Sequence, residues 1–217
     1  IAYLKANHPV EYLSALLTSV KTKLESAAVY LNECRLMGIE VEVPDINRSE
    51  MDFTPVPELE WTTDSAGSRT PGNIIFGLSA IRNVGEGVVE KILAERNANG
   101  PFESFLDFVE RVEIGALNKR TIESLIKGGA FDSLGHPRKG LLQVHEQIID
   151  LTVQRRKEHD MGVMSLFGES EDGPAFEERP PVPDVEFEKM PKLAHEKEML
   201  GLYISDHPLL GFEAQVR

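Results

Sequence analysis

The sequence predicts a mainly helical fold with a small β element. Residues 1–37 and 78–153 place apolar side chains at the three- and four-residue spacing of amphipathic helices. Between these stretches, residues 39–43 alternate apolar and charged side chains, which is the two-residue period of a half-buried strand. Glycine and proline recur at short intervals in the second helical stretch, so its helices are expected to be short and joined by tight turns.

The first part of the chain, residues 1–53, is predicted to form two helices followed by this strand. Pro9 suits the first position of a helix, because its ring fixes φ and its missing N–H would have no partner there. Gly38 suits the end of the second helix. Residues 54–76 are largely polar, and we expect a connector or long hairpin that returns through a short strand at 74–76.

Residues 77–154 are predicted to hold several short helices, beginning with one over residues 78–83. Ser104 and Asn118 are expected to cap two of them, because short polar side chains accept hydrogen bonds from the first N–H groups of a helix. A longer helix is expected to start at Pro137 and to reach Val153. The tight joints are typical of paired helical hairpins.

The last third of the chain changes character. Residues 155–185 open with a charged run and end in an acidic, proline-rich stretch, which buries too little apolar surface to order itself, so we expect a flexible loop. This loop contains an apolar island at residues 163–167. Within residues 186–217, one more helix is predicted from Met190 to Leu202.

The charge of the chain limits how it could meet a nucleic acid. The net charge is −13, which opposes binding through a general basic field. It is −5 over residues 1–73, −2 over residues 74–150 and −6 over residues 151–217. The middle third is therefore the least acidic, and a DNA contact there would have to be local.

Other features of the composition bound the class of protein. No apolar run approaches the roughly 18–20 residues that a membrane-spanning helix needs, so no membrane partner is expected. The single cysteine, Cys34, excludes a disulfide framework within the chain and favours a cytoplasmic protein. Because the chain opens at Ile1 and not at methionine, we expect a fragment of a longer protein.

The run from Leu78 to Val89 has the pattern of a helix-hairpin-helix: a short helix, a turn of small residues, and a second helix that starts at once. The amides of such a turn and the first N–H groups of the helix point outward together, and the positive end of the helix dipole favours a phosphate oxygen. Contacts of this kind are blind to base sequence. The residues expected to make them are Arg82, Asn83, Val84, Gly85 and Gly87.

Two other interpretations of this run stay open. It also fits an ordinary tight helical hairpin with a glycine at its corner. A dinucleotide-binding loop is a weaker match, because Glu90 stands where the third glycine belongs and a helix precedes the turn.

A second stretch, from Leu117 to Lys139, is expected to form a partner hairpin. It begins at the Asn118 cap, ends its first helix in a glycine pair, and carries basic residues at its helix ends. These basic residues are either phosphate contacts or solvated helix ends. The residues expected to reach DNA are Lys119, Arg120, Lys127, Gly128, Gly129, Arg138 and Lys139.

Five blocks of the sequence together resemble a known family. In order and spacing they are similar to the C-terminal half of the alpha subunit of bacterial DNA polymerase III, and the resemblance covers nearly the whole chain. The blocks are AYLKANHPVEYLSALLTSV, CRLMGIEVEVPDINRS, FGLSAIRNVGE, LNKRTIESLIKGGAFDSLG and EKEMLGLYISDHPL. In the first hairpin this family usually has a glycine where Asn83 stands, and asparagine tolerates the left-handed geometry that such a turn needs.

The resemblance implies a role for each part of the chain. Residues 1–53 would end the fingers domain, residues 54–76 would connect, and residues 77–154 would be a tandem helix-hairpin-helix that grips duplex DNA. Residues 155–185 would be a loop with a clamp-binding peptide, and residues 186–217 would lead toward an oligonucleotide-binding domain. The implied partners are duplex DNA, a sliding clamp and other replicase subunits.

The apolar island gives the sharpest partner hypothesis. It is similar to the pentapeptide by which bacterial polymerases hold the sliding clamp, in which glutamine, an apolar residue, any residue, leucine and phenylalanine follow one another. Leu166 and Phe167 would be the buried anchors, and valine replaces the usual glutamine. The alternative is an apolar patch that folds back on the protein's own core. The residues of the island are Val163, Met164, Ser165, Leu166 and Phe167.

No catalytic constellation is visible in the sequence. Polymerase chemistry needs acidic residues that hold two Mg²⁺ ions, and the carboxylates here fall in turns or solvated runs. The histidines show no metal-ligand spacing, so we expect no metal site and no cofactor in this segment, while the intact polymerase would use Mg²⁺. The segment alone should be inactive. Two competing classes remain, namely a stand-alone helix-hairpin-helix protein of DNA repair and an interaction scaffold without DNA contact.

Overall fold

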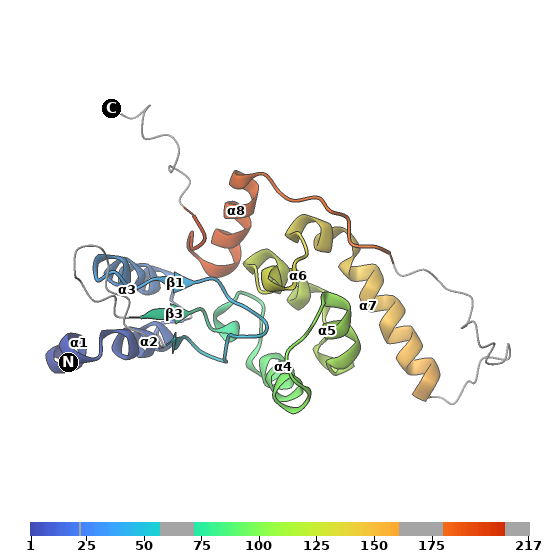
Figure 1. Cartoon of the computed structure of the whole chain (residues 1–217), viewed down its shortest axis with the longest axis horizontal. Helices are drawn as coiled ribbons and strands as arrows, with labels where there is room; N and C mark the ends of the chain where they lie inside the picture. The colour runs from blue at the N-terminus through green and yellow to red at the C-terminus, as the bar shows by residue number, and fades with distance from the viewer. Residues whose placement is uncertain (22, 57–71, 161–179, 207–217) are drawn as a thin grey trace.

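A computed structural model describes residues 1–21, 23–56, 72–160 and 180–206, and it confirms a mainly helical fold with a small β-sheet. In Figure 1 the N-terminal helices and the sheet occupy one end of the molecule, and the helices of the middle third extend to the other end. The elements of the described part are α1 (Ala2–Asn7), α2 (Pro9–Ser19), α3 (Leu24–Leu36), β1 (Val41–Glu42), β2 (Thr54–Val56), β3 (Asn73–Ile75), η1 (Leu78–Ala80), α4 (Glu86–Asn99), α5 (Phe105–Arg111), η2 (Ile114–Ala116), α6 (Lys119–Gly128), η3 (Asp132–Leu134), α7 (Arg138–Asp160) and α8 (Lys189–Leu200).

The sheet has three strands in the order β1-β3-β2. β1 pairs parallel to β3, with Val41 opposite Ile74, and β2 pairs antiparallel to β3, with Pro55 opposite Ile74. The strand β2 lies in the stretch that was predicted to be a connector or long hairpin. It is a short edge strand, paired only with β3, and the polar composition of the stretch gave no signal of it. Pro55 fits such an edge, since an edge strand leaves every second N–H without a ladder partner.

The turn that follows β1 fastens the N-terminal part to the helical part. Asn47 exchanges two hydrogen bonds with the backbone of Phe102, at 2.8 and 2.7 Å. The buried Arg96 of α4 donates to the carbonyls of Ile46 and Ser49 and to the Glu50 carboxylate. A buried guanidinium with this many acceptors holds its position firmly, so α4 and the turn form one structural unit.

Four phenylalanines form the centre of the helical part. Phe105 and Phe108 on α5 meet Phe131, which lies between α6 and η3, at ring-centroid distances of 5.2 and 5.0 Å. Phe102, in the connector between α4 and α5, packs edge to face on Phe108 at 5.1 Å. All four side chains are buried. Edge-to-face pairs at these distances favour a fixed ring geometry, which sets how α4, α5 and α6 lie against one another.

The helix caps and the helix end that the sequence predicted from neighbouring residues are confirmed. The Ser104 hydroxyl accepts a hydrogen bond from the N–H of Asp107, and the Asn118 carboxamide accepts from Arg120 and Thr121. Gly129 ends α6 in the left-handed conformation, with φ of 90°. One expectation was wrong: the helix predicted over residues 78–83 is only the 3₁₀ turn η1.

The helix α7 and the segment 180–188 are more ordered than the sequence indicated. α7 continues to Asp160, beyond the predicted boundary at residue 154. The segment 180–188, assigned in part to a loop, runs beside the start of α7, where the Gly140 N–H donates to the Val185 carbonyl at 3.0 Å. A side chain at Gly140 would collide with the backbone of Pro183, so this close approach requires glycine.

Candidate nucleic-acid interface

The first hairpin turns at Asn83, which has φ of 64° and is the only non-glycine residue with positive φ in the described chain. This confirms that asparagine carries the left-handed turn. Gly85, the residue before α4, has an ordinary φ of −83°, so the backbone does not require glycine there. At both Gly85 and Gly87 the space where a Cβ would lie is open. The absence of side chains therefore exposes the helix start to an approaching ligand.

The start of α4 carries an anion-binding arrangement in its backbone. The N–H groups of Val88 and Val89 bond to the Gly85 carbonyl, and in the described residues no side chain caps the helix. The N–H groups of Glu86 and Gly87 belong to the first turn, where a helix leaves its donors without partners. Gly85, Glu86 and Gly87 are all exposed. These donors and the dipole together suit an anion outside the protein.

The second hairpin places the start of α6 directly against the first one. The Thr121 hydroxyl donates to the Asn83 carbonyl at 3.1 Å, and the Asn83 carboxamide donates to the Ser124 hydroxyl at 3.2 Å. Arg82, next to Asn83, and Arg120, next to Thr121, are both exposed. The structure thus brings the turn before α4 into contact with the start of α6, and each of these two places carries an exposed arginine.

Two other residues expected at this surface are less available to an outside ligand, because one is buried and the other is ion-paired. Val84 is buried, and its side chain belongs to the core beneath the turn. Lys119 is partly exposed, but its ammonium pairs with Asp150 at 2.7 Å and Glu146 at 3.5 Å on α7. A phosphate would have to compete with these two carboxylates for Lys119.

The remaining expected residues lie away from this surface, because the predicted second hairpin runs from the start of α6 to the start of α7. The glycine pair lies at the far end of α6, before η3 and α7. Gly128 is buried against Leu200 and Ile81, and Gly129 against Arg138. Both glycines serve internal packing, so neither reaches an outside ligand.

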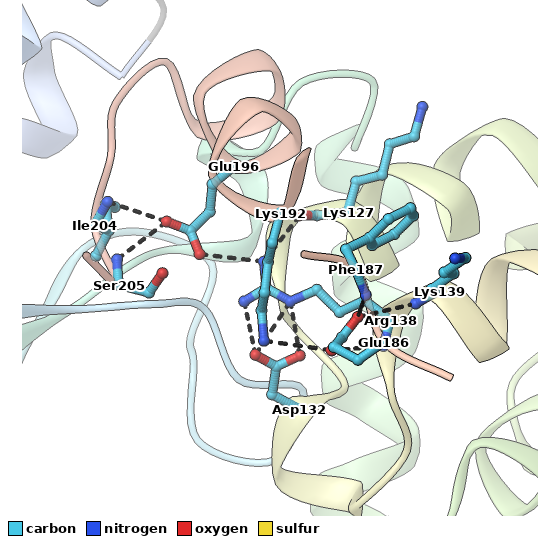
Figure 2. A network of polar contacts seen from close by, with 10 residues as sticks. All are labelled: Lys127, Asp132, Arg138, Lys139, Glu186, Phe187, Lys192, Glu196, Ile204 and Ser205. Atoms are coloured by element: carbon cyan, nitrogen blue, oxygen red, sulfur yellow. Dashed lines mark hydrogen bonds and ion pairs between the residues drawn. The ribbon is translucent and has the colours of Figure 1, made fainter. Parts of the chain in front are cut away.

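Arg138 is buried, with 2% of its side chain exposed, contrary to the expectation that it could reach a phosphate. Its guanidinium bonds to the carboxylates of Asp132 at 2.6 Å and Glu196 at 3.1 Å (Figure 2). Burial lowers the pKa of Arg138, but the hydrogen bonds and charge of Asp132 and Glu196 outweigh burial and raise it. The Arg138 side chain therefore has a structural role, and Glu196 of α8 helps to hold it in the interior.

The N–H groups at the start of α7 are likewise bonded to a side chain of this protein, the Glu186 carboxylate. The Glu186 carboxylate accepts hydrogen bonds from the N–H groups of Arg138 and Lys139, each at 3.3 Å, and from Phe187 (Figure 2). Lys192 pairs with the same carboxylate, and the Lys139 ammonium lies 6.0 Å from the Phe187 ring. Lys127 also has an internal partner, Glu123. Sequence patterns could not reveal these contacts, because Glu186 and Glu196 are 48 and 58 residues from Arg138.

Other predicted features are outside this arrangement. The apolar island, residues 163–167, lies outside the described residues. Within residues 1–21, 23–56, 72–160 and 180–206, no group of three or more His, Cys, Asp or Glu side chains is placed to hold a metal ion. Among the described helices, none is both long and apolar enough to cross a membrane.

Short helices joined by tight turns around one core, with the Asn83 turn bonded to the start of α6, define a helix-hairpin-helix unit. Comparison with known families agrees, because the helix-hairpin-helix motif matches residues 38–141.

Similarity to individual proteins extends along the whole chain. The DNA polymerase III subunit alpha of Mycobacterium tuberculosis H37Rv is 46% identical over 215 residues, which is 97% of this chain and 17% of that protein. The subunit of Thermus aquaticus is 38% identical over 211 residues, covering 97% of this chain and 16% of the relative. That of Pseudomonas aeruginosa is 33% identical over 234 residues, covering 100% and 19%. The chain belongs to the family of DNA polymerase III alpha subunits, and it spans about one sixth of the length of these curated relatives.

Proposed function

We propose that this chain holds duplex DNA by its phosphate backbone as part of a bacterial replicative DNA-directed DNA polymerase. The observation that carries the proposal is that the turn leading into α4 meets the start of α6 through the Asn83–Thr121 and Asn83–Ser124 hydrogen bonds. Open space over Gly85 and Gly87 lets a strand approach the backbone. Arg82 and Arg120 flank the two starts and supply the positive charge.

The chemistry of such a contact fits a replicase. Backbone amides and arginines bind phosphates without regard to sequence, as a polymerase that copies any template requires. The two Mg²⁺ ions and the acidic residues of the polymerase reaction are assigned to the remainder of the intact protein. This segment then contributes grip and position, and no chemical step.

A salt titration of DNA binding tests the proposal. The chain is titrated with a fluorescent duplex between about 50 and 200 mM salt, because each phosphate contact contributes about −0.9 to the slope of log K against log salt. The double variant Arg82→Gln/Arg120→Gln should bind more weakly and reduce that slope by about 2. The matched control, Arg35→Gln/Arg48→Gln, removes two exposed arginines from the N-terminal part. Equal slopes for the three proteins, or no binding by the parent at low salt, would refute the contact.

We also propose that residues 163–167 tether the polymerase to the sliding clamp. The support is the likeness of the sequence to the clamp-binding pentapeptide, with Leu166 and Phe167 as anchors that bury apolar surface. Titration against a bacterial clamp compares the parent with Leu166→Ala/Phe167→Ala. Binding that disappears in the double variant supports the tether. Equal binding by both proteins would move the contact to another site.

A further inference from the structure

A lysine from the N-terminal part of the chain lies against the first hairpin. Lys21, which follows α2, has 19% of its side chain exposed. Its ammonium donates to the Asp52 carboxylate at 2.7 Å, the Glu86 carboxylate at 2.8 Å and the Ser79 hydroxyl at 3.0 Å. Three acceptors take the three protons of an ammonium group, so Lys21 has no N–H left for an outside ligand.

The two carboxylates stand at the place where the proposed phosphate would bind. Glu86 is the first residue of α4, beside Gly85 and Gly87. Asp52 is fixed next to η1, because the Ser79 N–H donates to the Met51 carbonyl at 3.0 Å and a side chain at Gly77 would collide with the Asp52 backbone. Without a cation between them, both charges would repel an anion at the helix start.

We propose that Lys21 is a positioning residue for DNA, whose ammonium neutralises Asp52 and Glu86 and thereby allows the start of α4 to accept a backbone phosphate. This inference rests on the proposed function. Burial lowers the pKa of Lys21, but its hydrogen bonds to the two carboxylates raise it more, so the ammonium is charged at neutral pH. The same contacts tie the N-terminal part of the chain to the first hairpin.

The test uses the complete chain and the same duplex. Lys21→Met removes the charge and keeps the apolar stem of the side chain. We expect its affinity to fall about three- to tenfold at about 0.1 M salt, because the uncompensated carboxylates lie within about a Debye length of the phosphate. The slope of log K against log salt should stay within about 0.5 of the parent, since Lys21 itself touches no phosphate.

Four further variants separate charge from structure. Lys21→Arg should bind like the parent, and Lys21→Met/Glu86→Gln should recover at least about half of the lost affinity on a logarithmic scale. The matched control is Lys5→Met, which removes the lysine of the Lys5–Glu33 ion pair between α1 and α3. Should Lys21→Met fail to fold, Asp52→Asn/Glu86→Gln leaves Lys21 uncompensated and should bind more tightly than the parent.

The outcomes distinguish the inference from the proposed function. Loss in Lys21→Met with recovery in the double variant supports the inference. Equal affinities of Lys21→Met and Lys5→Met, or no recovery on removal of Glu86, would overturn it while DNA binding stands. A slope reduced by about 0.9 would make Lys21 a direct phosphate contact and overturn it as well. If the parent does not bind duplex DNA, both the function and the inference fail.

Discussion

At the scale of single residues, Asn83 combines two roles in the first hairpin. Its φ of 64° makes the turn, and its carboxamide reaches Ser124 on α6. Glycine would satisfy the turn as well, but it offers no side chain to join the two hairpins. Asparagine is therefore less suited than glycine to the left-handed turn, but its side chain links the turn to α6.

Substitutions at Asn83 should separate these roles. Asn83→Ala places a Cβ in the left-handed region and removes the hydrogen bond, so we expect it to lower the free energy of unfolding by about 1–2 kcal/mol. Asn83→Gly loses only the hydrogen bond and should cost about 0.5–1 kcal/mol. Urea unfolding of the three proteins measures the difference. An alanine variant as stable as the glycine variant would show that the left-handed conformation imposes no strain here.

At the scale of secondary structure, the start of α6 serves both folding and the proposed contact. Asn118 caps the helix with two hydrogen bonds, and it stands two residues before the exposed Arg120. Aspartate caps a helix as well as asparagine does and adds a negative charge that the helix dipole favours. A phosphate at the same place would be repelled by that charge.

Asn118→Asp should therefore leave stability unchanged within about 0.5 kcal/mol and weaken DNA binding several-fold at low salt. Asn118→Ala should lower the free energy of unfolding by about 1 kcal/mol through loss of the cap. Thermal unfolding and the duplex titration are measured on both variants. Unchanged affinity in the aspartate variant would mean that DNA does not approach the start of α6.

The start of α7 gives a prediction on pH. Burial raises the pKa of Glu186, but hydrogen bonds from the N–H groups of Phe187, Lys139 and Arg138 outweigh it, and the pKa lies below its ordinary 4.5. A carboxyl group with a depressed pKa in the folded state stabilises the protein above its unfolded pKa, and this stabilisation is lost as pH falls through the folded pKa.

Glu186→Gln should consequently destabilise the chain at pH 7 by about 0.3–1 kcal/mol, the range for a partly exposed carboxylate at a helix start. The difference from the parent should shrink as pH falls below about 4.5, the ordinary pKa, and vanish below the folded pKa. Urea unfolding of both proteins at pH 7, 5 and 3.5 measures this difference in the free energy of unfolding. A difference independent of pH would assign the effect to packing and not to the carboxylate charge.

The sequence predicted what local chemistry determines and missed what distant residues determine. The Ser104 and Asn118 caps, the Gly129 stop and the left-handed Asn83 follow from contacts within about one helical turn. The burial of Arg138 could not be foreseen, because a basic residue after Pro137 at a helix start has the same local pattern whether it faces water or Glu196.

At the scale of the whole molecule, α8 braces both hairpins. The Met199 carbonyl accepts a hydrogen bond from the Arg82 N–H, and Leu200 packs on Gly128 at the end of α6. Glu196, with no exposed surface, joins the Arg138 guanidinium to the N–H groups of Ile204 and Ser205 (Figure 2). One carboxylate thus links the hairpin pair to the chain that follows α8.

Removing that carboxylate should have effects at both ends of the link. Glu196→Ala leaves the buried Arg138 with Asp132 as its carboxylate partner and frees the two backbone donors, so we expect a loss of about 3–5 kcal/mol. Amide exchange at Ile204 and Ser205 should become fast, and DNA affinity should fall because Arg82 loses its brace. The matched control is Glu198→Ala, which changes an exposed glutamate two residues further along α8. It should lower the free energy of unfolding by less than about 0.5 kcal/mol. Parental exchange rates in Glu196→Ala would show that the carboxylate does not hold the segment after α8.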